Sequence, residues 1–433
     1  MQVTREMTMD KNGLPKVLKV RQHFPRPRVE DLRAEILKQC AEDRISGLVE
    51  PGMSVAVTVG SRGISGIDVM VRSLVAALKE AGAKPFIVPA MGSHGGATAE
   101  GQEELLSDYG VTEESCGAPV RSSMDVVELS TSQSGVTVYM DRLASEADGV
   151  VLMGRIKPHT DFHGEVESGL MKMSAIGLGK HAQALALHAH GVKGIRDYMI
   201  EVGEEVLASG KILFGVAVVE NAYEETAVIE AIPAAEIRSR EPELLKVATE
   251  LLPKLPVDDL DILFVDTLGK DFSGTGMDTN VIGRFRIPGE DEPESPNVKY
   301  VIVGDISDHS RGNALGVGLA DFTTTRLVAK IDHQKTRENV LTSTFVERAK
   351  IPLAFESDRE AILAAVRCTW GVSADELRFA HIPNTLDLGS IHVSENLASE
   401  LSSERVSIEG EARELAFDES GNLTAFGDRH TVA

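Results

Sequence analysis

The chain has 433 residues, of which 42% are hydrophobic, 26% are charged and only 4% are aromatic. This length exceeds what one ordinary core accommodates, so we expect two domains. The formal net charge of −23 repels nucleic acid and anionic membranes, which excludes both as partners. An anionic ligand would therefore need a local basic pocket.

Cysteine usage and the N-terminus indicate a cytoplasmic protein. The three cysteines, Cys40, Cys116 and Cys368, are far apart, which argues against a disulfide framework and against a thiolate metal site. Residues 1–28 mix charged and apolar side chains and do not resemble a signal peptide. No apolar run approaches the roughly 18 residues that a membrane span needs.

After a helical pattern over residues 29–50, the chain twice repeats the order strand, glycine-containing loop and helix. The strands are expected at 54–59 and 84–89, the loops at 60–63 and 92–96, and the helices from 67 to 82 and from about 98. This order predicts a parallel sheet with helical crossovers. Ligands of such sheets bind beyond the carboxyl ends of the strands, where both loops lie.

Further buried strands are expected at 148–153 and 212–219, and the first of them leads into Lys157-Pro-His159. Two prolines within 251–256 predict a domain boundary. The expected architecture is an N-terminal α/β domain over 1–256 and a smaller C-terminal α/β domain over 257–433, with a ligand cleft between them. The second domain has expected strands at 262–265, 300–303 and 351–354, and an exposed loop at 287–297.

Histidines are unusually dense in one part of the chain, because five of the twelve lie between His159 and His190. His94 stands apart, between glycines. His94 and His159 each follow a predicted strand, so both are expected at the ligand edge of the sheet. Imidazole takes and returns a proton near neutral pH, and two imidazoles facing one carbon suit stereo-inversion.

Two competing interpretations apply to these histidines. A single loop histidine most often serves only as a solvated or hydrogen-bonded side chain. His159 and His163 are four residues apart, which would suit zinc if they lay on a helix. Pro158, Gly164 and Gly169 argue against a helix there, and no His-Glu-x-x-His motif occurs, so a hydrolytic zinc site is disfavoured.

Three further features suggest anion binding or covalent chemistry. Arg62 follows a predicted strand and would offer a guanidinium fork to a carboxylate or phosphate. Gly95 and Gly96 open a helix whose backbone amides could bind phosphate. Lys172 lies among apolar residues, where a lysine is either a surface side chain that reaches solvent or a nucleophile.

These residues together resemble the nickel-dependent lactate racemase family, most strongly over Val55 to His190. The family motif is a Pro-His, a glycine-rich stretch, a lysine and, sixteen residues later, a histidine, as at Lys172 and His188. The resemblance implies a nickel-pincer nucleotide (nickel pyridinium-3,5-bisthiocarboxylic acid mononucleotide) bound covalently to Lys172. It further implies that His188 ligates nickel, that His94 and His159 are catalytic, and that the cofactor and substrate contacts fall on Arg62, Gly95 and Gly96.

The sequence departs from the family pattern at three places. His159 precedes Lys172 by thirteen residues where the family has ten, and His163, nine before, is the rival assignment. The family's acidic residue before the arginine is Val59 here. A second-domain Tyr-Gln-x-x-Lys motif is replaced by the segment 269–280, in which substrate contacts are expected from Lys270, Asp278 and Asn280.

By resemblance, the expected activity is inversion of a 2-hydroxy acid through removal and return of a hydride. The departures favour a larger or more polar acid than lactate. Expected partners are this small anionic acid and the enzymes that make the cofactor, and a homo-oligomer is left open. Two alternatives stay open as well: a pincer-dependent sugar-acid epimerase, and a small-molecule binding protein without the cofactor. His309, in a second-domain loop, is equally compatible with a structural and a functional role.

Overall fold

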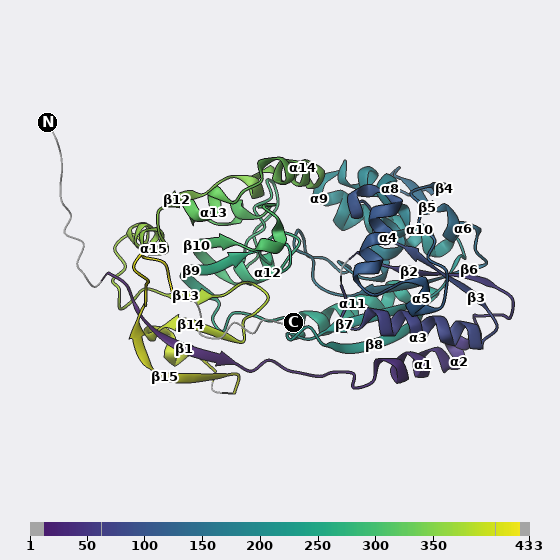
Figure 1. Ribbon diagram of the computed structural model, residues 1–433, viewed down its shortest axis with the longest axis horizontal. Helices are drawn as coiled ribbons and strands as arrows, with labels where there is room; N and C mark the ends of the chain where they lie inside the picture. Colours follow the sequence, from purple (N-terminus) through teal and green to yellow (C-terminus); the bar gives the residue numbers. More distant parts are fainter. Residues whose placement is uncertain (1–12, 62, 403, 425–433) are drawn as a thin grey trace. The chain divides into compact units, whose positions relative to one another are not determined.

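The computed structural model describes residues 13–61, 63–402 and 404–424 (Figure 1). The chain divides into two compact units, Pro25–Leu252 and the combination of Met1–Phe24 with Pro253–Ala433. The N-terminal strand therefore does not belong to the domain predicted over 1–256. Strand β1 (Lys16–Gln22) pairs antiparallel with β14 (Ser390–Ser394) and β15 (Val406–Glu414), so it completes a sheet of the C-terminal unit (Figure 1).

The unit 25–252 is built on a five-stranded sheet. The strand order is β3-β2-β6-β7-β8, with β2 (Ser54–Val59), β3 (Lys84–Pro89), β6 (Gly149–Arg155), β7 (Ile212–Glu220) and β8 (Thr226–Pro233). The first four strands are mutually parallel, as predicted, because helices connect them on the faces of the sheet. The edge strand β8 is antiparallel to β7 and was not predicted.

Helices cover both faces of this sheet, and a small hairpin is added to it. The helices are α1 (Leu32–Ala41), α2 (Asp43–Ser46), α3 (Ile67–Glu80), η1 (Gly95–Ala97), α4 (Ala99–Asp108), α5 (Glu113–Cys116), α6 (Arg142–Glu146), α9 (Gly191–Lys193), η3 (Gly194–Tyr198), α10 (Met199–Ala208) and α11 (Ala234–Leu251), and the hairpin is β4 (Val126–Thr131) with β5 (Thr137–Asp141). The predicted helix over 29–50 is divided because Glu42 is extended. Helices α1 and α3 bury apolar side chains against one face of the sheet.

One long helical segment, residues 170–188, lies against the opposite face and across the strand ends. It consists of α7 (Leu170–Lys172), a π-helical turn η2 (Met173–Gly177) and α8 (Leu178–His188). Glycines permit its close approach, since a Cβ at Gly177 would lie 2.9 Å from the Ala90 carbonyl oxygen, and one at Gly154 would lie 2.8 Å from Met173 Cγ. The segment therefore touches the ends of β3 and β6.

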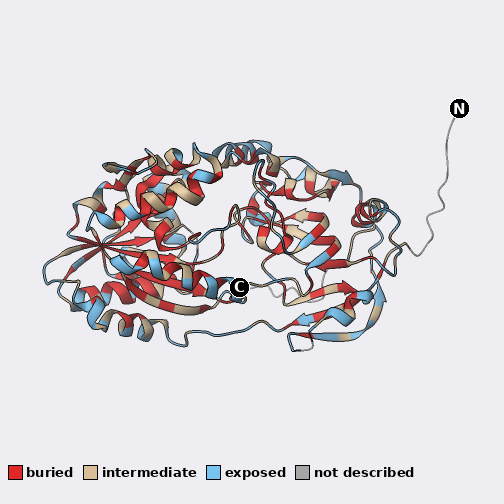
Figure 2. Ribbon diagram, turned by 180° about the vertical axis from the view of Figure 1, so that it is seen from behind, coloured by how far each residue is buried: buried red, intermediate tan, exposed pale blue. Residues whose placement is uncertain are grey.

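The other unit contains an eight-stranded sheet with the order β12-β11-β10-β9-β13-β14-β1-β15. Its remaining strands are β9 (Asp259–Leu268), β10 (Asn297–Ile306), β11 (Phe322–Thr324), β12 (Leu353–Phe355) and β13 (Phe379–Ile382), and its helices are α12 (Thr279–Ile282), η4 (Asp308–Ser310), η5 (Val317–Leu319), α13 (Thr325–Ala329), α14 (His333–Ser343), η6 (Val346–Ala349), α15 (Asp358–Arg367) and η7 (Glu395–Glu400). Strands β9 to β13 are parallel, and apolar clusters pack on both faces (Figure 2).

The mixed α/β class predicted from the sequence is confirmed. Among the described helices, none combines the length and the apolar character that crossing a membrane requires.

Candidate functional site

The first group of candidate residues lies at the carboxyl ends of β2 and β3. Ser61 follows β2, and its Oγ is hydrogen-bonded to Nδ1 of His94, which follows β3 and is exposed. Tyr109 on the neighbouring chain segment donates its hydroxyl to the Ser61 carbonyl oxygen at 2.7 Å. The ring of His94 is thus oriented through Nδ1. Arg62, the adjacent predicted site residue, lies outside the described residues.

Residues 157–168, which follow β6, form a closed loop. The Lys157 amide donates to the Ser168 carbonyl at 3.0 Å, and the Ser168 amide donates back at 3.2 Å. Inside the loop, the buried Glu167 carboxylate accepts hydrogen bonds from the amides of His159 and Gly164, and it contacts Nδ1 of His163 at 3.2 Å. His159 and His163 therefore share a loop rather than a helix face.

His159 contacts Lys172 directly. Nε2 of His159 lies 2.7 Å from Nζ of Lys172, and the ring stacks on Phe162 with 4.5 Å between centroids. The Asp161 amide donates to Nδ1 of His159 at 3.1 Å, so the proton of a neutral ring is on Nε2 and faces the lysine. The His159 ring and the Lys172 amine are therefore in direct contact. His163, by contrast, is exposed and contacts Glu167.

His188 ends the same helical segment that carries Lys172. Burial lowers its pKa, the positive charge of protonated Lys172 lowers it further, and Asp161 opposes both effects. A lowered pKa keeps the imidazole neutral, which is the form that ligates metals. Lys172, His159 and His188 thus form one electrostatically coupled group.

A fully buried carboxylate supports the start of this helical segment. Glu241 on α11 accepts a hydrogen bond from the Met171 amide at 2.9 Å. Burial raises the pKa of Glu241 to about 7, and the hydrogen bonds from Met171 and Leu170 oppose this rise. A side chain at Gly169 would collide with the carboxylate, so glycine is needed there. The sequence carried one signal for this residue that we did not use: Glu241 occupies the buried face of the helix, between the apolar residues Ile237 and Leu244.

The loop glycines after β3 have a structural role that the sequence did not reveal. Gly95 and Gly96 have φ values of +64° and +66°, in the left-handed region. A Cβ at Gly95 would lie 2.7 Å from the backbone nitrogen of Gln102, whereas a Cβ at Gly96 would meet no atom within 4 Å. Gly95 is therefore required where η1 packs against the start of α4.

The predicted substrate residues of the second unit take part in hydrogen bonds within their own loops. Nζ of Lys270 donates to the Gly274 carbonyl at 2.6 Å. Asp278 caps α12, and its Oδ1 accepts from the backbone and the side chain of Asn280 at 3.0 and 2.9 Å. The side chain of His309 is 85% exposed, with Nδ1 3.9 Å from Asp271 Oδ2.

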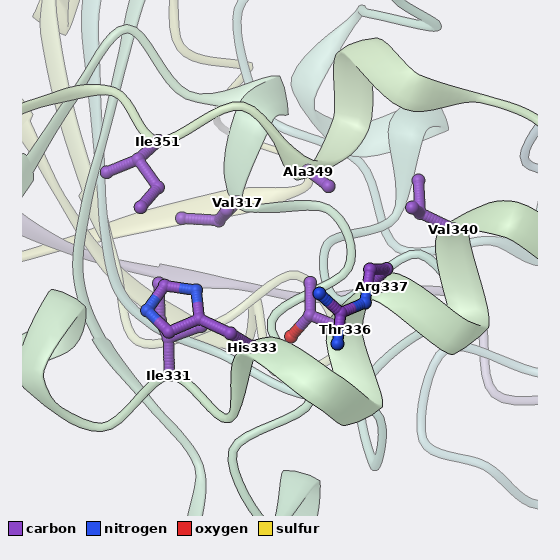
Figure 3. A pocket seen from close by; sticks show the side chains of 8 residues that line it. All are labelled: Val317, Ile331, His333, Thr336, Arg337, Val340, Ala349 and Ile351. Carbon is purple, nitrogen blue, oxygen red and sulfur yellow. The ribbon is translucent and has the colours of Figure 1, made fainter.

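A small hollow of about 250 Å³ in the same unit is separate from all predicted site residues. Its lining is mostly apolar and comprises Val317, Ile331, His333, Thr336, Arg337, Val340, Ala349 and Ile351 (Figure 3). None of the predicted site residues belongs to this lining.

The donor set around Lys172 fits a metal that arrives within a larger organic group. In the described part of the chain, no three His, Cys, Asp or Glu side chains come together as a bare ion would require. One neutral imidazole, His188, is present beside one lysine amine, Lys172. Imidazole suits nickel among other transition metals, and the amine could link covalently to a carboxyl-derived group.

Comparisons with known proteins found similarity in sequence and in fold. Residues 3–195 match the family model described as the lactate racemase N-terminal domain. The solved lactate racemase apoprotein from Thermoanaerobacterium thermosaccharolyticum is 13% identical with a TM-score of 0.51, over 86% of this chain and 98% of that one. A protein from Thermotoga maritima is 14% identical with a TM-score of 0.50, over 76% of this chain and 84% of that one.

At these identities the two structures share the fold with this chain. Curated proteins provide no significant sequence match. Residues 3–195 therefore resemble the lactate racemase N-terminal domain in sequence, and the chain shares the fold of a solved lactate racemase apoprotein.

Proposed function

We propose that this protein is a racemase or epimerase that inverts the hydroxyl-bearing carbon of a 2-hydroxy acid, with a nickel-pincer nucleotide attached at Lys172. The observation that carries the proposal is the contact of 2.7 Å between Lys172 Nζ and His159 Nε2. This contact pairs a lysine that can accept a covalent group with an imidazole that can exchange a proton.

The residues of the chain would divide the work as follows. Lys172 would hold the cofactor and His188 would ligate its nickel. When bound, the group supplies the acceptor and donor of the hydride, so that the redox step belongs to the cofactor. His94 and His159 would each take up the substrate hydroxyl proton and return it, one for each hand of the substrate. The carboxylate contacts remain the predicted Arg62 and Lys270.

Orientation of the two imidazoles supports this division. His159 is held by Glu167 through its backbone and by Asp161 through Nδ1, so its Nε2 is the proton-exchanging atom. The ring of His94 is likewise held through Nδ1, by the hydroxyl of Ser61. A base fixed through one nitrogen presents the other at a defined position, which reduces the entropy lost in reaching the transition state.

The test is production of the protein together with the cofactor-synthesis enzymes, followed by intact mass and nickel analysis. We expect a mass adduct and nickel on the unmodified chain and on Lys157→Ala, and neither on Lys172→Ala. In D₂O the loaded protein should invert a 2-hydroxy acid, screened over small and sugar-derived acids, without incorporating deuterium at the α-carbon, because the hydrogen leaves and returns as hydride. His94→Ala and His159→Ala should fold and lose inversion.

Three outcomes would redirect the proposal. Full turnover in both histidine variants would refute their roles. An unmodified mass after loading would favour a small-molecule binding protein with this fold. Inversion confined to sugar acids would identify the protein as a sugar-acid epimerase.

A further inference from the structure

A buried ion pair lies behind the loop that carries His94. Lys180, within the segment 170–188, and Asp141 both have fully buried side chains, with 3.1 Å between Nζ and Oδ2. Burial lowers the pKa of Lys180 and raises the pKa of Asp141, while each opposes the shift of the other. Lys180 also has a φ of +55° and a ψ of −155°, a costly conformation for a residue with a side chain.

The ammonium group of Lys180 makes two further contacts. It donates to the carbonyl oxygen of Pro89, at the end of β3, and to Oε1 of Gln102 at 3.3 Å. Gln102 lies on α4 and is completely buried. Nε2 of Gln102 donates to the carbonyl oxygens of Gly92 at 3.0 Å and His94 at 3.2 Å.

The amide of Gln102 can adopt only one orientation in this setting. Its oxygen faces a cation, and its NH₂ group faces two carbonyl oxygens that need donors. The side-chain amide of Gln102 is therefore held in one orientation, and its hydrogen bonds restrain the backbone on both sides of Ser93. Ser61 orients the His94 ring, whereas Gln102 fixes the backbone from which that ring projects.

We propose that Gln102, held by Lys180 and Asp141, is a positioning residue for His94. The network links the His94 loop to the same helical segment that carries Lys172 and His188. A second contact supports this link, because the Gly92 amide lies 3.5 Å from the Gly177 carbonyl oxygen. The inference rests on the proposed function only in giving His94 a role in proton transfer.

The chemistry of the network argues for positioning rather than for stability alone. A buried ion pair is a weak source of stability, since removing two charges from water offsets much of their attraction. Apolar side chains of the same volume would fill this space without the cost of burying two charges. What they could not supply is a donor pair directed at two carbonyl oxygens of one loop.

The test compares Gln102→Glu with Gln183→Glu in protein without cofactor. Gln183 is a matched control because it is fully buried and bridges the Tyr139 amide and the Thr137 carbonyl, with no contact to the His94 loop. In Gln102→Glu, Lys180 keeps its acceptor, but a carboxylate oxygen replaces the donor to Gly92 and His94. We expect amide hydrogen exchange at His94 and Ala97 to rise at least about tenfold, because the loop hydrogen bonds lose their support.

NMR of ¹⁵N-labelled histidine rings provides the second readout, with the His94 signal assigned by His94→Gln. It should shift in Gln102→Glu and stay unchanged in Gln183→Glu. Gln102→Met, which keeps the volume and removes the donors, replaces Gln102→Glu if the latter does not fold. Unchanged exchange and ring signals in a folded Gln102 variant, or equal changes in Gln183→Glu, would overturn the inference. Neither readout requires enzymatic activity, so failure of the proposed function would leave this test intact.

Discussion

Replacing Glu241 with glutamine should change how the stability of the unit 25–252 depends on pH. The carboxyl group is fully buried, and burial raises its pKa from 4.5 to about 7. In the unfolded chain the group is exposed and regains its ordinary pKa. Folding therefore favours the protonated form, and the glutamine variant imitates that form at every pH.

The direction and the magnitude of this pH dependence follow from the linkage between proton binding and folding. Because the folded pKa is the higher one, the stability that protonated Glu241 contributes is complete below pH 4.5 and is lost as the pH rises through 7. A difference of this size corresponds to a total of about 3 kcal/mol, of which about 2 kcal/mol is lost between pH 5.5 and 8.5. Glu241→Gln should lack this loss, so its advantage over the natural chain should grow with pH.

The assay is urea unfolding at several pH values. Unfolding is monitored by hydrogen exchange in peptides from residues 170–188, because these peptides report on the unit 25–252. Glu243→Gln is the matched control, because Glu243 lies on the same helix and its side chain is 62% exposed in an ion pair with Arg240. The difference between Glu241→Gln and the natural chain should rise by about 2 kcal/mol over this range, and that of the control should stay flat. Parallel curves for Glu241→Gln and the natural chain would refute the reasoning.

Three further substitutions test the site. Gly95→Ala should destabilise the unit by more than about 1 kcal/mol in thermal unfolding, because its Cβ would collide with the backbone of Gln102. Gly96 also has a positive φ, but a Cβ there would meet no atom within 4 Å, so Gly96→Ala should destabilise the unit less. Glu167→Ala should make the loop 157–168 susceptible to limited proteolysis, because Glu167 bonds two of its amides, whereas the exposed Glu165→Ala should not. His188→Ala should lose nickel in metal analysis of the loaded protein, and the exposed His190→Ala should retain it.

The sequence predicted strands that contain a continuous run of buried, mostly apolar residues. Strands β2 and β3 match their predicted bounds, β7, β9 and β10 include theirs, and β6 begins one residue later than predicted. The missed strands include β1, which mixes exposed and buried residues, and β8, which mixes buried and half-buried ones, so neither has a continuous buried run. The placement of β1 in the C-terminal unit depends on pairing with strands distant in sequence and has no local signal.

The candidate site was predictable where a loop follows a recognisable strand. His94 and His159 were expected after strands, and in the structure they follow β3 and β6. Ser61, Gln102, Glu167 and Glu241 were missed as supporting residues. Their roles arise from contacts with other segments, and single polar residues carry no periodic signal that would identify such contacts.

The closed loop over 157–168 also explains how this chain can depart from the family spacing. His159 and Lys172 are separated by three residues more than in the family pattern. In the structure, the paired amides and carbonyls of Lys157 and Ser168 fix both ends of the loop, and Glu167 bonds the His159 amide from inside it. Added residues can then enlarge the exposed part at 163–165, at a small cost in loop-closure entropy, without displacing His159. The position of His159 relative to Lys172 is therefore set by the loop base and the helical segment 170–188 rather than by the count of residues between them.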